Sequence, residues 1–153
     1  MATNDKKQRN TNNVDATGLT VAANIKRLRG GLSFPELSRR LSAVGRPLPV
    51  IALRRIEEGN RNVTVDDLMA FAIVFGVSPL TLLMPEYASN QAETRITGTS
   101  TSVSSLRAWS WAKCETPLPS NESDAMQNDN DVAGMLDASE LFRFRSNPKK
   151  LEH

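Results

Sequence analysis

The side chains that most often perform catalysis are scarce in this sequence. It contains one cysteine, Cys114, and one histidine, His153, which we interpret as part of a purification-tag remnant. No imidazole is then left to pair with the thiol for nucleophilic chemistry, and the sequence shows no paired metal-ligand motif. It also lacks a glycine-rich loop of the kind that cradles phosphates. We therefore expect a protein that is not an enzyme, has no catalytic residues, and uses no metal or other cofactor.

Positive charge is the chemistry that the sequence does offer, and it is unevenly distributed. Residues 19–85 carry nine Lys or Arg against five Asp or Glu, a balance of +4, whereas residues 86–147 carry five against nine, a balance of −4. Arg54, Arg55 and Arg61 lie close together in the basic part. This division is typical of a module that binds a polyanion, followed by a segment that does not touch it.

Five short helical patterns in residues 19–85 would position these arginines. In each, apolar residues recur every three or four positions, and capping or helix-breaking residues mark the ends. Ser33 and Glu36 form a predicted capping box, and Thr64 is a predicted N-cap. The expected helices cover residues 20–29, the segment from Ser33 to a turn at 45–47, residues 49–58, the segment from Thr64 to Gly76, and the segment from Ser78 to Pro85.

The remaining segments give weaker patterns. We expect residues 1–18 to be a disordered basic arm and residues 115–131, which contain five acidic residues, to be an acidic flexible linker. Residues 86–114 predict an extension with a short strand at 94–101 and a helix capped by Ser102. Residues 132–150 predict a C-terminal helix, and residues 151–153 are interpreted as the remnant of a purification tag. The apolar residues of this half are expected to pack on the bundle or on a second chain.

The basic part resembles a known family of DNA-binding domains. The stretches IKRLRGGLSFPELSRRL and IALRRIEEGNRNVTVDDLMAFAIVFGVSPLTLL are similar to the helix-turn-helix of lambda-repressor and Cro-like regulators, the xenobiotic-response-element type. The resemblance covers residues 19–85; the turn GRPLP and the segment Trp-Ser-Trp resemble actinobacterial and actinophage versions. It implies an all-α fold, a five-helix helix-turn-helix bundle with a smaller, partly flexible C-terminal segment, in which helix 49–58 reads the major groove of double-stranded DNA.

The resemblance also assigns roles to individual positions. It places base reading on Val50, Ile51, Arg54 and Arg55, and phosphate contacts on Ser33, Phe34, Asn60, Arg61 and Asn62. For Ser33 and Phe34 the expected donors are backbone amides at the start of a helix. Arg46, in the turn on the expected DNA side, is a further candidate for a phosphate contact. A structural ion pair between the first helix and the end of the third falls on Arg27 and Glu57.

Two departures from the family pattern leave alternatives open. The turn before the third helix is longer by about two residues, and the usual polar residues at the start of that helix are replaced by Pro49, Val50 and Ile51. Apolar side chains can contact thymine methyl groups but cannot form bidentate hydrogen bonds to a base. Val50 and Ile51 therefore either touch methyl groups or pack against the turn, and the hydrogen-bonded readout would rest on Arg54 and Arg55.

Two functions remain as hypotheses. The first is a sequence-specific transcriptional regulator, a repressor of the phage immunity type or a host regulator, that binds double-stranded DNA as a monomer or homodimer. The second is a protein-interaction module, such as an antitoxin or anti-regulator, that retains the bundle. The polar N-terminus and the absence of a run of about 18 apolar residues predict a cytoplasmic protein, in the bacterial cytosol or nucleoid, without a membrane partner.

Overall fold

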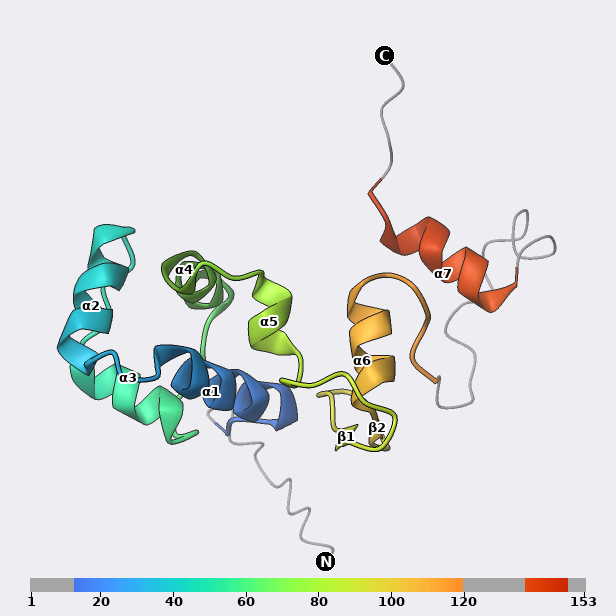
Figure 1. Ribbon diagram of the computed structural model, residues 1–153, viewed down its shortest axis with the longest axis horizontal. Coiled ribbons are helices and arrows are strands. Elements are labelled where there is room, and N and C mark those ends of the chain that lie inside the picture. Colours follow the sequence, from blue (N-terminus) through green and yellow to red (C-terminus); the bar gives the residue numbers. More distant parts are fainter. Residues whose placement is uncertain (1–12, 120–136, 149–153) are drawn as a thin grey trace, which may run out of the picture.

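The computed structural model describes residues 13–119 and 137–148, and within them the chain is mostly helical, as predicted (Figure 1). Seven helices and one two-stranded sheet follow one another along these residues. The elements are α1 (Ala16–Arg29), α2 (Phe34–Ala43), α3 (Val50–Glu57), α4 (Val65–Phe75), α5 (Pro79–Leu83), β1 (Glu93–Thr94), β2 (Val103–Ser104), α6 (Ser105–Ala112) and α7 (Ala138–Ser146).

Side-chain caps determine where several helices begin. Ser33, Thr64 and Ser78 each accept a hydrogen bond from a backbone N–H in the first turn of α2, α4 and α5, which confirms these three predicted starts. The first helix begins earlier than expected, because the Asp15 carboxylate accepts from the backbone N–H of Ala16 at 2.7 Å. Residues 16–18 therefore belong to α1 and not to an arm; residues 1–12 lie outside the described residues.

Helices α1 to α5 share one hydrophobic core. In this core α1 packs against α3, α4 and α5, while α2 packs against α3 and α4. The predicted inner residues of α2 and α3 are all buried, and Leu48 from the turn between these helices joins them. The buried residues of this core are Val21, Ile25, Leu37, Leu41, Leu48, Leu53, Ile56, Ala70, Phe71, Ala72 and Leu82. Burial of these side chains is the main force that holds α3 in place.

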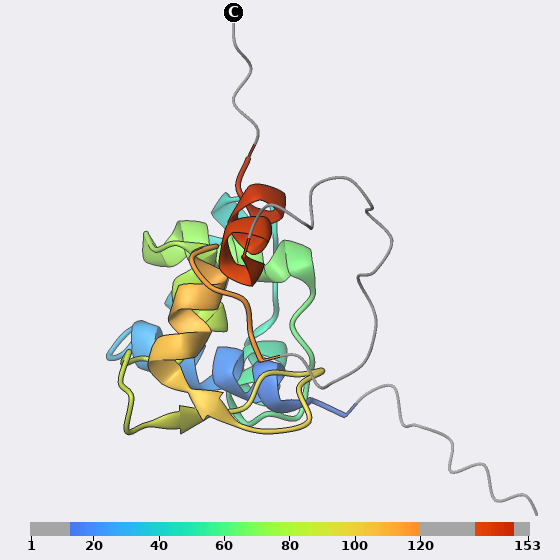
Figure 2. The ribbon, with the colours of Figure 1, turned by 90° about the vertical axis from the view of Figure 1, so that its right-hand side faces the viewer.

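A smaller second core holds residues 86–119 against the bundle. Met84, Ile96, Val103 and Ala108 form this core, and the indole N–H of Trp109 donates to the carbonyl of Pro85 at 2.8 Å. Figure 1 shows this extension at one end of the molecule and α2 and α3 at the other; in Figure 2 the extension lies in front of the bundle. The extension therefore packs on the bundle, one of the two expected arrangements.

The elements of the extension differ in detail from the prediction. The strand expected at 94–101 is limited to Glu93–Thr94, which pairs antiparallel with Val103–Ser104. Ser104, not Ser102, caps the following helix, because its hydroxyl accepts from the backbone N–H of Arg107. Ser102 instead donates to the carboxylate of Glu93 across the hairpin.

The C-terminal helix is shorter than the predicted range 132–150. It is capped by Asp137, and Arg143 links it to the turn after α6 through a hydrogen bond to the Glu115 carbonyl at 2.9 Å. Most of the predicted linker (residues 120–131), the expected helix residues 132–136 and 149–150, and the interpreted tag at 151–153 lie outside the described residues. Among the helices that are described, none has both the length and the apolar character to cross a membrane.

Candidate nucleic-acid interface

The turn before α3 is attached to its neighbours by several contacts. Residues 44–49 form this turn, and the side chain of Leu48 enters the core with 6% of its surface exposed. The Ser38 hydroxyl, on α2, donates to the Leu48 carbonyl at 2.6 Å. Pro49 precedes the helix as a residue without a side-chain capping bond. The start of α3 is therefore fixed by contacts of the turn and not by a local cap.

Arg46 connects this turn to α4. Its Nε atom donates to the Asp67 carboxylate at 2.6 Å, while Thr64 and Asp67 form a reciprocal capping box at the start of α4. Burial alone would raise the pKa of Asp67, which is 2% exposed, but the hydrogen bonds from Arg46 and Thr64 outweigh it and lower the pKa below its ordinary value. The guanidinium of Arg46 is thus bound to Asp67 within the protein, which weakens the interpretation of Arg46 as a phosphate contact.

A second ion pair connects α1 to the end of α3, and its cationic partner is not the expected one. Arg29 donates to both carboxylate oxygens of Glu57, at 2.6 and 2.9 Å, with 17% and 6% of the two side chains exposed. The prediction that Arg27 forms this pair is wrong. Positions 27 and 29 lie about 200° apart around a helix, so only one of them can face α3. Arg27 instead lies 3.9 Å from the Glu86 carboxylate and donates to Asn24.

The face of α3 that points away from the core presents Ile51, Arg54 and Arg55. All three side chains are exposed, and Ile51 has 64% of its surface accessible, whereas Val50 is half-buried. Ala52, Leu53 and Ile56 occupy the opposite, buried face, as the helical period predicts. The two residues at the apolar start of the helix therefore differ in exposure: Val50 is half-buried, and Ile51 is available for contact.

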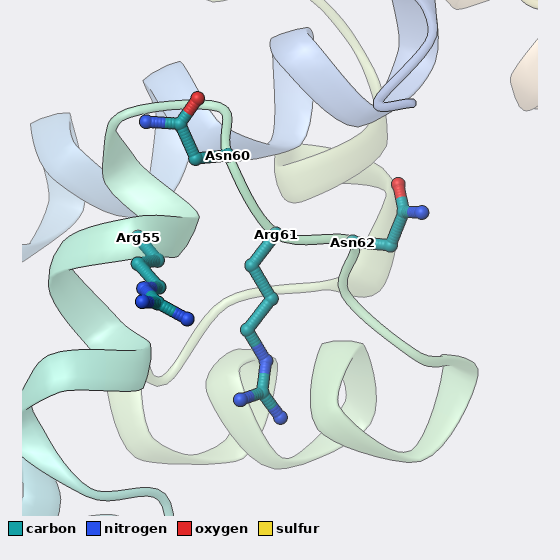
Figure 3. A pocket seen from close by; sticks show the side chains of 4 residues that line it. All are labelled: Arg55, Asn60, Arg61 and Asn62. Carbon is teal, nitrogen blue, oxygen red and sulfur yellow. The ribbon is translucent and has the colours of Figure 1, made fainter. Parts of the chain in front are cut away.

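A polar hollow lies at the end of α3. It has a volume of about 360 Å³ and is lined by Arg55, Asn60, Arg61 and Asn62, which brings four of the predicted contact residues together (Figure 3). Gly59 allows the chain to turn there, with φ of 72°; a Cβ at this position would lie 2.9 Å from the Leu19 side chain. In Figure 3 Arg55 and Arg61 extend on one side of the loop, and Asn60 and Asn62 point away from them.

The arginines of residues 19–85 fall into two groups according to their partners. Arg27, Arg29, Arg39, Arg40 and Arg46 each lie within 4.0 Å of a carboxylate oxygen. Arg54, Arg55 and Arg61 form no ion pair among the described residues. Three of the four Lys or Arg residues in 19–85 that form no ion pair among the described residues therefore lie on α3 and the loop after it; the fourth is Lys26 on α1.

The first turn of α2 differs in two ways from the sequence-based expectation. Ser33 caps the helix as predicted, by accepting from the backbone N–H of Glu36, but Glu36 does not complete the predicted capping box. The Glu36 carboxylate accepts hydrogen bonds from Arg39 and Arg40, and these lower its pKa to about 2. The aromatic ring of Phe34 lies near two guanidinium groups, Arg29 at 4.1 Å and Arg54 at 4.9 Å. Sequence reasoning considered only the backbone amide of Phe34 and missed its ring.

Comparison of the chain with models of protein families, with curated proteins and with solved structures finds no match in any of the three. Support for the candidate interface therefore comes from the residues of this chain alone.

Proposed function

We propose that this chain is a sequence-specific double-stranded DNA-binding protein that places α3 in the major groove and regulates transcription, most simply as a repressor. One observation carries the proposal: three exposed arginines without a carboxylate partner among the described residues, Arg54, Arg55 and Arg61, gather on α3 and its following loop. The charge of these side chains is available to an anionic ligand, because no carboxylate of the described residues pairs with it.

The arrangement around α3 supports the finer assignment of α1 to α5 as a helix-turn-helix bundle of the lambda-repressor type. In such a bundle the second helix braces the recognition helix, whose outward face stays free. Here α2 packs against α3, the turn between them is anchored by Leu48 and Arg46, and α3 keeps an exposed face. These contacts are what a rigid recognition helix requires, because base reading depends on fixed geometry.

The chemistry of each side chain suggests its role. Exposed Arg54 would donate to the O6 and N7 atoms of a guanine, and exposed Ile51 would contact a thymine methyl group. The hollow lined by Arg55, Asn60, Arg61 and Asn62 combines guanidinium and amide donors, a set that suits a phosphate group. Repression then needs no catalysis, because a protein that occupies a promoter excludes polymerase. A homodimer on a two-fold operator is part of this proposal.

The proposal predicts a strong dependence of DNA affinity on salt. Each arginine that neutralises a phosphate releases counterions. The negative slope of log affinity against log salt concentration should therefore become shallower by roughly one in Arg61→Ala. The matched control is Arg95→Ala, which removes one exposed arginine from the extension at the other end of the molecule and should leave the slope unchanged. Fluorescence anisotropy with a labelled duplex at several salt concentrations measures both. An affinity that does not change with salt would refute the proposal.

The exposed position of Ile51 favours a second candidate, a protein-interaction module. An apolar side chain at the start of the exposed face of α3 would then contact a protein partner. This candidate predicts that Ile51→Ser abolishes binding to that partner while DNA binding is absent at any salt concentration. The two functions are thus separated by the same titration.

A further inference from the structure

The ring of Phe34 lies at the junction of three helices. Phe34 is the first residue of α2, and its ring packs against the shared core while two cations approach it. The guanidinium carbon of Arg29, from α1, is 4.1 Å from the ring centre, and that of Arg54, from α3, is 4.9 Å away. Both distances are within the range in which the ring quadrupole attracts a cation.

The two arginines have different capacities for a further partner. Arg29 uses its Nε and Nη2 atoms on Glu57 and donates from Nη1 to the Leu32 carbonyl at 2.9 Å. Its charge is balanced and its donors are engaged. The side chain of Arg54 contacts the ring of Phe34 and forms no hydrogen bond or ion pair with the described residues. The hydrogen-bond donors of Arg54 are therefore available to a ligand, although its position is constrained.

A contact of this kind changes what an arginine can do at a DNA surface. A free arginine side chain samples many rotamers and must be ordered when it binds, whereas a guanidinium held over an aromatic face has lost part of that freedom beforehand. The Arg54 side chain donates no hydrogen bond to the described residues while it contacts the ring, so its N–H groups remain for bidentate hydrogen bonding. Glu57 also neutralises Arg29, so that Arg54 can approach the same ring without an unbalanced neighbouring charge.

We propose that the side chain of Phe34 is a specificity-determining positioning residue, which holds Arg54 in the orientation that reads one base pair. This inference rests on the proposed DNA-binding function and extends it. It differs from the expected role of Phe34 as a backbone phosphate donor, because every substitution at this position except proline retains the amide. It therefore predicts an effect of the ring itself.

The test compares Phe34→Leu, which removes the ring, with Phe34→Tyr, which keeps it. In the free protein, NMR resonances of the Arg54 side chain should show a ring-current shift that Phe34→Tyr retains and Phe34→Leu loses. In selection from random duplexes, Phe34→Leu should reduce the preference at one base pair by roughly two- to tenfold, and this should be the pair affected by Arg54→Ala. Phe34→Tyr should select the wild-type motif. Thermal unfolding of both variants reports any loss of packing.

Each alternative result overturns the inference in a distinguishable way. If the Arg54 resonances are the same in wild type and Phe34→Leu, the contact does not exist in solution, whatever the protein binds. If they differ but the selected motif is unchanged, or if affinity falls equally for all duplexes, the ring is structural and does not set specificity. If the wild type enriches no duplex, the proposed function itself fails, and the role of Phe34 fails with it.

Discussion

Two groups of arginines near α3 differ in their partners. On the side of α3 that faces the rest of the protein, each arginine hydrogen-bonds a largely buried carboxylate; these are Arg29 and Arg46. On the outward side and in the next loop, the arginines have no such partner among the described residues; these are Arg54, Arg55 and Arg61. The first pair of arginines fixes α3 and its turn to α1 and α4. The second group leaves positive charge unneutralised at the surface. The contrast separates residues whose loss should destabilise the fold from residues whose loss should weaken binding alone.

The largest expected effect is a loss of stability on substitution of Glu57, the partner of Arg29. Glu57→Ala strands Arg29, which keeps only 17% of its side chain exposed, without its charge partner. We expect a loss of about 3 kcal/mol in the free energy of unfolding, the low end of the range for a broken buried pair because part of Arg29 still reaches water. Chemical denaturation measures the change.

The control for this prediction is Glu58→Ala, one position along and exposed, which should change stability little. Arg29→Ala and Arg27→Ala offer a second matched pair, since the contact with Glu57 belongs to Arg29 alone. Equal losses of stability in Glu57→Ala and Glu58→Ala, or a larger loss in Arg27→Ala than in Arg29→Ala, would contradict the claim that the Arg29–Glu57 ion pair stabilises the fold.

A smaller effect is expected at Asp67, and it depends on pH. Asp67→Asn removes the charge that Arg46 contacts but keeps a side-chain oxygen that can accept from the backbone N–H of Thr64, so we expect a loss of about 1–3 kcal/mol at neutral pH. The folded state lowers the pKa of Asp67 below its ordinary value of 3.8, so its ionised form stabilises the fold above that pH. This contribution is lost as the pH falls through the lowered pKa.

The measurement is the difference in unfolding free energy between wild type and Asp67→Asn from pH 7 downward. It should stay constant to about pH 4 and then shrink. Glu36, whose pKa is also low, is present in both proteins, so its titration cancels in the difference. A difference in unfolding free energy that grows as the pH falls would mean that Asp67 is not ionised in the folded state.

Local sequence signals predicted the helices well, because caps and apolar periodicity act over a few residues. Ser33, Thr64 and Ser78 begin helices as expected, while the start of α1 was missed because its cap, Asp15, lies in a polar run that resembles a disordered arm. Contacts between helices were harder to predict. An error of two positions placed the ion pair on Arg27, on the wrong side of α1.

Two further contacts join segments for which no local pattern specifies a partner. Arg46 and Asp67 are separated by 21 positions, and the sequence suggested only that Asp67 suits the positive end of a helix. The ring of Phe34 meets Arg54 from the next helix, although its position in sequence suggested only a backbone role. These contacts follow from how the shared core orients α1, α2 and α3, which sequence periodicity does not encode.

The most direct test of the central claim, that the outward face of α3 reads DNA, is selection of bound sequences from random duplexes with wild type, Arg54→Ala and the control Arg95→Ala. We predict that the wild type and Arg95→Ala enrich the same motif. Arg54→Ala should lose preference at one base pair, at a cost of about 1–3 kcal/mol on the selected site, with unchanged thermal stability. Enrichment of no motif by the wild type, or of an unaltered motif by Arg54→Ala, would contradict the account.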